Sequence, residues 1–160
     1  MQKYVLIHNL KPIVKNTQFS MYDWPLHLTL SPRFAVDIEQ KGFDADLSNL
    51  ITKQKPFKTT VKNDEYFGLE SKIHVSLLDL TPQLFELHNE LLDLLESYGA
   101  VFDEPNYSRS GYIPHVTVQK SGRVFEGDII KINSLSLVDM FPDGDIKQRK
   151  VLKNYKFKND

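Results

Sequence analysis

The chain has 160 residues, of which 41% are hydrophobic and 26% charged, a balance typical of one folded domain rather than a disordered segment. Its 20 Lys and Arg residues against 21 Asp and Glu leave a formal net charge of -1, which argues against a surface-wide grip on long nucleic acid. The chain has no cysteine, so disulfides, thiolate metal ligands and a thiol nucleophile are all excluded.

In chain order, residues 4–8 form the first predicted strand, and their apolar run is too short for the core of a signal peptide. An irregular connection with Pro12 and Pro25 follows, and residues 26–30 then alternate as a strand does. No stretch approaches the ~20 apolar residues needed to cross a bilayer. We therefore expect one cytoplasmic domain over residues 1–160, without a linker, which acts as a monomer and binds neither a membrane nor a DNA duplex.

Two helices are expected. The first covers residues 44–55, where apolar residues recur at i, i+3 and i+4 before Pro56. The second begins with Thr81 as its N-cap and Pro82 in its first turn, and it ends at Gly99. The order of elements is α+β. Further strands are predicted at residues 57–61, 66–69, 72–80, 115–119, within 129–140, and at 148–158.

Two of the predicted strands carry the same pattern, His-Leu-Thr-Leu at 27–30 and His-Val-Thr-Val at 115–118. Because strand side chains alternate between faces, each copy places its His and Thr on one face and its two apolar residues on the other. With 5 histidines in this composition, two such copies would arise by chance with a probability on the order of 0.0005. The repeated pattern therefore predicts two imidazoles and two hydroxyls around one cleft.

Such a set of side chains suits attack on a phosphodiester. A neutral imidazole can take a proton from the attacking oxygen, and a protonated one can give a proton to the leaving oxygen. The threonine hydroxyls can donate hydrogen bonds to the phosphoryl oxygens, where charge accumulates. This chemistry requires neither a metal nor a cofactor.

Paired His-x-Thr-x motifs in an α+β domain of this size resemble the two-histidine (2H) phosphoesterase superfamily, which includes 2'-5' RNA ligase-like proteins and 2',3'-cyclic nucleotide phosphodiesterases. Residues 112–115, Tyr-Ile-Pro-His, are similar to the aromatic-x-Pro-His sequence that leads into the second motif of that family. Lys120 stands where the family often has a basic residue. The resemblance implies two lobes, each an antiparallel β-sheet with a packed helix, around a central cleft that carries both motifs.

The resemblance also implies a function: a metal-independent phosphoesterase that hydrolyses 2',3'-cyclic phosphate or 2'-5' phosphodiester bonds of nucleotides or short RNA ends. By analogy, His115 activates the water and His27 protonates the leaving oxygen. Two alternatives remain open, 2'-5' RNA ligase activity and a non-catalytic nucleotide- or RNA-binding module. The predicted substrate-binding residues are Thr29, Thr117, Tyr112 and Lys120.

The other histidines are weaker candidates. His74 begins a near copy of the motif, His-Val-Ser-Leu, for which a structural or peripheral role is the better interpretation. His8 ends the first strand, and a role near the cleft is left open for it. His88 lies off the main apolar stripe of the second helix and is expected to face solvent. The basic strand at residues 147–158 is expected to present a solvated face, with an RNA-contacting edge as the alternative.

The chain departs from the family pattern directly after the first motif. Ser31, Pro32 and Arg33 replace the apolar or aromatic continuation that is often found there. Together with Trp24, Arg33 flanks the first motif, and both are minor candidates for contact with a base or a phosphate. This departure indicates a divergent branch of the family.

Overall fold

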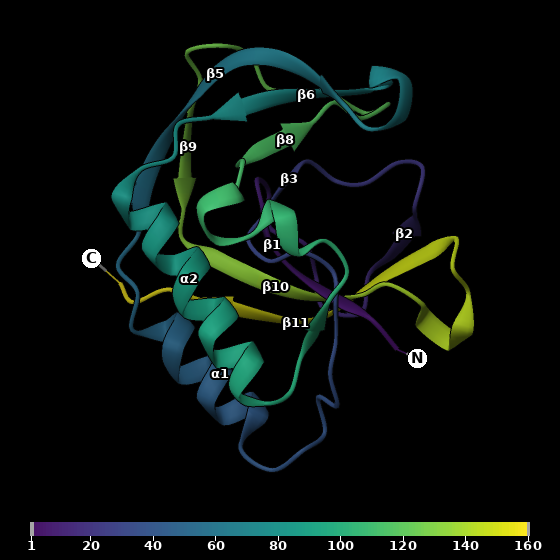
Figure 1. The fold of residues 1–160 in the computed structure, drawn as a ribbon, viewed down its shortest axis with the longest axis vertical. Helices are drawn as coiled ribbons and strands as arrows, with labels where there is room; N and C mark the ends of the chain where they lie inside the picture. The colour runs from purple at the N-terminus through teal and green to yellow at the C-terminus, as the bar shows by residue number, and fades with distance from the viewer. Residues whose placement is uncertain (1, 160) are drawn as a thin grey trace.

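The computed structural model describes residues 2–159, so Met1 and Asp160, the two ends of the predicted domain, lie outside the described residues. Within that range the chain forms two α-helices and eleven strands, which are shown in Figure 1. The helices are α1 (Phe43–Thr52) and α2 (Pro82–Ser97). The strands are β1 (Tyr4–Asn9), β2 (Gln18–Ser20), β3 (His27–Thr29), β4 (Phe34–Ala35), β5 (Phe57–Phe67), β6 (Ile73–Leu78), β7 (Val101–Phe102), β8 (His115–Thr117), β9 (Ile129–Ile132), β10 (Ser134–Asp139) and β11 (Gln148–Lys156).

The strands join in one antiparallel sheet with the order β2-β11-β10-β1-β3-β8-β6-β5-β9, and β4 and β7 pair off this path beside β1. The expected α+β fold is therefore confirmed. The two strands that carry the repeated motif, β3 and β8, are neighbours near the middle of the path. Chain segments far apart in sequence thus meet at the centre of the sheet.

Alternation along β1 separates two hydrophobic clusters. Leu6 packs in the larger cluster with Leu28, Val116 and most of the buried apolar residues of both helices, whereas Val5 and Ile7 pack in a smaller cluster on the other face. The helices therefore cover one face of the sheet only. They lie side by side and contact each other, and α1 also contacts β11 (Figure 1). The division into two lobes with one helix each stays a prediction.

The boundaries of α2 agree with the expected capping signals, whereas α1 ends at Thr52, three residues before the expected end at residue 55. The Thr81 hydroxyl accepts a hydrogen bond from the backbone N–H of Leu84 at 3.2 Å, and Pro82 lies in the first turn of α2. Gly99, just past the helix, has φ +86°, a conformation that favours glycine. Neither helix in residues 2–159 is long and apolar enough to cross a membrane.

In two regions of the chain, the predicted number of strands was wrong. The predicted pieces 57–61 and 66–69 are one strand, β5, because its polar middle stays paired to β6 across a shift in register between Val61 and Asp64. Residues 129–140 contain two strands rather than one, since the chain changes neighbours at Asn133. The strand before it, β9, pairs with β5, and the strand after it, β10, pairs with β1 and β11.

Candidate active site

The pairing of β3 with β8 brings the two motifs together. The strands run antiparallel with Leu28 opposite Val116, so the register places His27 opposite Thr117 and Thr29 opposite His115. Leu28 and Val116 are 0% and 1% exposed on the helix-covered face. Since side chains alternate along a strand, both imidazoles and both hydroxyls project from the opposite face. The two histidines are diagonal neighbours, which in an antiparallel pair lie about 7–8 Å apart.

Both imidazoles are held in the same way. The Nδ1 of His27 is 2.9 Å from the carbonyl oxygen of Pro25, and the Nδ1 of His115 is 2.8 Å from that of Ile113, in each case two residues earlier. A carbonyl oxygen only accepts, so Nδ1–H donates in both rings. The Nε2 atom of each neutral ring therefore carries the free lone pair and can exchange a proton with a substrate.

Aromatic rings border each imidazole. Trp24 stacks on His27 with ring centres 4.6 Å apart, and Phe67 meets His115 edge-on at 5.1 Å. Burial, opposed by the Pro25 carbonyl and reinforced by the nearby His115, lowers the pKa of His27 to about 4. Burial also lowers the pKa of His115 below its usual value. Both rings are therefore neutral at pH 7 without a bound anion.

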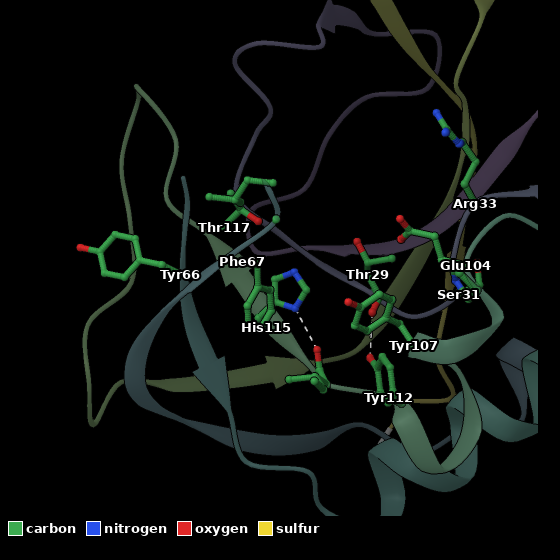
Figure 2. A pocket seen from close by; sticks show the side chains of 14 residues that line it. Thr29, Ser31, Arg33, Tyr66, Phe67, Glu104, Tyr107, Tyr112, His115 and Thr117 are labelled. Carbon is green, nitrogen blue, oxygen red and sulfur yellow. Dashed lines mark hydrogen bonds between the residues drawn. The ribbon is translucent and has the colours of Figure 1, made fainter. Parts of the chain in front are cut away.

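The two threonine hydroxyls are available for a ligand. Within residues 2–159, the side chains of Thr29 and Thr117 make no hydrogen bond, whereas the hydroxyls of Thr52 and Thr59 donate to backbone carbonyls. Both free hydroxyls line a cavity of about 600 Å³ together with His115, whereas His27, stacked on Trp24, is not among the lining residues. Figure 2 shows Phe67 beside His115, and Ser31, Arg33 and Glu104 on the other side of Thr29. A phosphoryl group in this cavity would find hydroxyl donors and an imidazole within one space.

A sequence model described as the 2'-5' RNA ligase superfamily matches residues 7–124, a span that includes both motifs. The chain belongs to this superfamily. The resemblance to the 2H phosphoesterases is thereby confirmed. A comparison with curated proteins found no match.

Solved structures share the fold of this family member at low sequence identity. The Thermus thermophilus protein TT0787 is 17% identical over 100% of both chains, with a TM-score of 0.60. E. coli LigT complexed with 3'-AMP is 16% identical over 98% of both chains, with a TM-score of 0.59. A protein described as a phosphoesterase is 15% identical over 98% of both chains, with a TM-score of 0.58.

The remaining predicted site residues lie in different places. Tyr112 lines the cavity, and its hydroxyl donates to the Thr29 carbonyl at 2.7 Å, so it links the lead-in to the second motif with the first motif (Figure 2). Burial raises the pKa of Tyr112, which keeps the hydroxyl a donor. Lys120 is an exposed turn residue beyond β8 and is not among the residues that line the cavity. Its contact with substrate stays a prediction.

The expectation that His88 faces solvent was wrong. Its side chain is 0% exposed, and its ring stacks on Tyr112 with centres 3.9 Å apart and planes within 3°. Nδ1 donates to the Leu30 carbonyl at 2.6 Å, and Nε2 accepts from the Arg109 backbone N–H at 3.0 Å. The sequence held a signal for this, because residues 84, 88, 91 and 95 follow i, i+4, i+7 and i+11 along one face of α2.

The other two histidines lie away from the cavity. His8 is opposite Leu28 in the sheet, so it projects from the helix-covered face, where its Nδ1 donates to the Ser134 carbonyl at 2.8 Å. His74 stacks on Tyr66 and its Nε2 is 2.8 Å from Asp64. His74 and Arg123 lower the pKa of Asp64 to about 2, as both hold its carboxylate. These contacts agree with the structural role favoured for His74.

Two basic side chains of β11 are engaged within the fold. Lys153 pairs with Asp44 of α1 at 2.6 Å, and buried Arg149 donates to the carbonyls of Met140 and Ile146. Between residues 2 and 159, no group of three or more His, Cys, Asp or Glu side chains is arranged to hold a metal ion.

Proposed function

We propose that the protein is a metal-independent phosphoesterase that hydrolyses 2',3'-cyclic phosphate or 2'-5' phosphodiester bonds of nucleotides or short RNA ends. The observation that carries the proposal is the antiparallel pairing of β3 and β8, which puts His27 and His115 diagonally on one face with each Nε2 free. Membership of the 2'-5' RNA ligase superfamily supports phosphodiester chemistry. A nucleotide substrate is supported by the fold's likeness to LigT, which was solved with 3'-AMP.

In the proposed reaction, a phosphodiester lies between the two imidazoles. Following the family analogy, Nε2 of His115 takes a proton from water as its oxygen attacks phosphorus, and Nε2–H of His27 gives a proton to the departing ribose oxygen. The P–O bond to the ribose breaks as the new P–O bond forms, and the two rings exchange protonation states. The hydroxyls of Thr29 and Thr117 donate to the non-bridging oxygens as their charge grows.

The lowered pKa values have a consequence for this scheme. The free protein holds both imidazoles neutral at pH 7. The general acid, His27, must therefore become protonated when the substrate binds. A phosphodiester anion near the ring favours the protonated form and raises its pKa. The rate constant kcat/KM reflects the free enzyme, and its bell-shaped pH profile should therefore have its maximum below about pH 6.5.

Replacement of either histidine tests the proposal. His27→Ala and His115→Ala should each lower kcat on nucleoside 2',3'-cyclic monophosphates by about 10²–10⁴, because proton transfer is lost. Activity of the unmodified protein should persist in EDTA. His74→Ala is the matched control, since that imidazole pairs with Asp64 outside the cavity. Full activity of either active-site variant on every cyclic phosphate tested would rule out the catalytic pair.

Ligation is a second candidate because the matching family model is named for it. The same two imidazoles act as base and acid when a ribose hydroxyl replaces water as the attacking group. A 2'-5' bond then forms. Incubation of RNA ends that carry 2',3'-cyclic phosphate and 5'-hydroxyl groups separates the two reactions, since joined product appears only with ligation. A non-catalytic binding module would bind 2'- or cyclic-phosphate ends without turnover.

A further inference from the structure

The cavity wall on the far side of Thr29 from Phe67 presents a carboxylate (Figure 2). Glu104 lines the cavity, and its side chain makes no hydrogen bond or ion pair with any part of the chain that the structure describes. A carboxylate repels a phosphate anion, so the Glu104 side chain is not suited to bind the phosphoryl group. It is suited instead to accept hydrogen bonds from a neutral part of the ligand.

A short 3-10 turn presents Glu104 together with an aromatic ring. Glu104 caps the turn Pro105–Tyr107, and the N–H of Tyr107 donates to the Glu104 carbonyl at 3.1 Å. Residues three apart in such a turn project to the same side, and both side chains line the cavity. Tyr107 is 59% exposed, so its ring is open to a planar ligand. An acceptor group and a stacking surface are thus placed side by side.

Close contacts fix this turn on both sides. The N–H of Asp103 donates to the Arg33 carbonyl at 2.9 Å, which ties the turn to the segment after the first motif. A Cβ atom at Gly111 would lie 2.0 Å from the carbonyl oxygen of Asn106, so the backbone there approaches more closely than any other residue allows. The position of Glu104 relative to the motif strands is therefore determined by backbone packing.

The fixed charges of the cavity nearly cancel. Arg33 and Glu104 are the fixed cation and the fixed anion among the described lining residues, and the Nε of Arg33 already donates to Asp103 at 2.5 Å. A polyanionic RNA needs several cations along its path. Exposed apolar side chains surround the cavity instead, and bases stack on such surfaces. These exposed lining residues are Tyr66, Ile73, Tyr107 and Ile113.

We propose that Glu104 and Tyr107 form a nucleobase subsite that favours guanine, in a cavity that takes a substrate with one phosphodiester group. The proposal rests on the phosphoesterase function above and deepens it. The Watson–Crick edge of guanine has two adjacent donors, N1–H and the N2 amino group, that match the two oxygens of a carboxylate. The same edge of adenine turns an unprotonated nitrogen toward the carboxylate. Tyr107 stacks the base while Glu104 reads this edge.

The test compares guanosine, inosine and adenosine 2',3'-cyclic monophosphates as substrates of the whole protein. We expect kcat/KM for guanosine to exceed that for adenosine by about tenfold to a hundredfold, with inosine between them, because inosine keeps N1–H and lacks the amino group. Glu104→Gln should bring the guanosine-to-adenosine ratio close to one. Glu126→Gln changes an exposed carboxylate outside the cavity and should keep the ratio. Equal turnover of guanosine and adenosine, or an unchanged ratio in Glu104→Gln, overturns the guanine subsite.

A second arm uses a ten-nucleotide RNA with a guanosine 2',3'-cyclic phosphate end. The single-phosphodiester cavity predicts that this RNA has a kcat/KM no higher than the mononucleotide, with little dependence on salt. If the KM of this RNA is much lower than that of the mononucleotide and rises steeply with salt, the single-phosphodiester cavity is overturned. If no compound is hydrolysed, the proposed function fails, and calorimetry with guanosine and adenosine 2'-monophosphates on the same variants still decides the guanine preference.

Discussion

At the scale of single residues, His88 joins parts of the chain that both lead to the site. Its neutral ring donates to the carbonyl of Leu30, the last residue of the first motif, and accepts from the backbone N–H of Arg109 in the loop before the second. It also stacks on Tyr112, whose hydroxyl binds the Thr29 carbonyl. Burial keeps the pKa of His88 below its usual value, so the accepting nitrogen stays unprotonated near pH 7.

Replacement of His88 should therefore cost more stability than that of an exposed histidine. His88→Phe keeps a ring against Tyr112 but leaves the Leu30 carbonyl and the Arg109 N–H without partners. Loss of these two buried hydrogen bonds should lower the free energy of unfolding by about 3 kcal/mol, measured by urea denaturation. His74→Phe, which breaks only a partly exposed pair, should lower it by much less. Equal losses in the two variants would contradict this role.

At the scale of elements, the site lies on two strands of three residues each, β3 and β8. Alternation of apolar and polar residues predicted both strands and the common face of His and Thr within each. The partner of a strand is not encoded in its own alternation, so only the structure shows that β3 and β8 are adjacent. The 3-10 turn that carries Glu104 was not expected, because three residues are too few for a periodic pattern.

The close approach at Gly111 gives a prediction for this turn. Gly111→Ala places a methyl group against the Asn106 carbonyl, so the loop that carries Tyr107 and leads to Tyr112 must shift. We expect kcat/KM on cyclic nucleotides to fall about tenfold or more, since a displacement near 1 Å is enough to cost that much. Gly122→Ala is the control, because its Cβ would meet only Leu26 at an ordinary 3.8 Å. Unchanged kinetics in Gly111→Ala would show that the loop does not position the site.

At the scale of the whole molecule, four of the histidines are held neutral by burial. The pKa values of His8, His27, His88 and His115 are all below the usual value, and that of His27 falls to about 4. In the unfolded chain these groups titrate near pH 6.5. Below that pH the unfolded state binds more protons than the folded state, so acid favours unfolding.

Stability should accordingly fall between about pH 6.5 and 4. In this window a histidine that is protonated only in the unfolded state contributes up to about 1.4 kcal/mol per pH unit to the slope of the free energy of unfolding, and His27, with its pKa of about 4, contributes down to the lower end. Urea denaturation at half-unit steps of pH measures the slope. Between about pH 7.5 and 8.5 the curve should be nearly flat, because the histidines are neutral in both states there. A free energy of unfolding that stays constant from about pH 7 to 5 would contradict the burial of neutral rings.

The sequence alone allowed the α+β class, both helices and the family to be predicted, because periodic apolar residues, capping signals and a repeated four-residue motif are local features. The face covered by the helices and the cavity lining depend on contacts between distant segments. Glu104 and Phe67 illustrate this, since neither belongs to a motif and both border the cavity. His88 lies between these cases, because its spacing from Leu84, Leu91 and Leu95 was visible in the sequence but it was placed off the main apolar stripe of the helix.

The contact between β3 and β8 has a mechanical consequence. Leu28 faces Val116 at its centre, and each strand is paired over three residues with its other neighbour, β3 with β1 and β8 with β6. The separation of the two imidazoles is therefore set by how these two strands pair. Because Leu28 and Val116 also belong to the larger hydrophobic cluster, a small change in core packing at this contact alters the separation of the two imidazoles. The catalysed rate should thus respond to small deformations of the sheet that spectroscopic measures of folding do not detect.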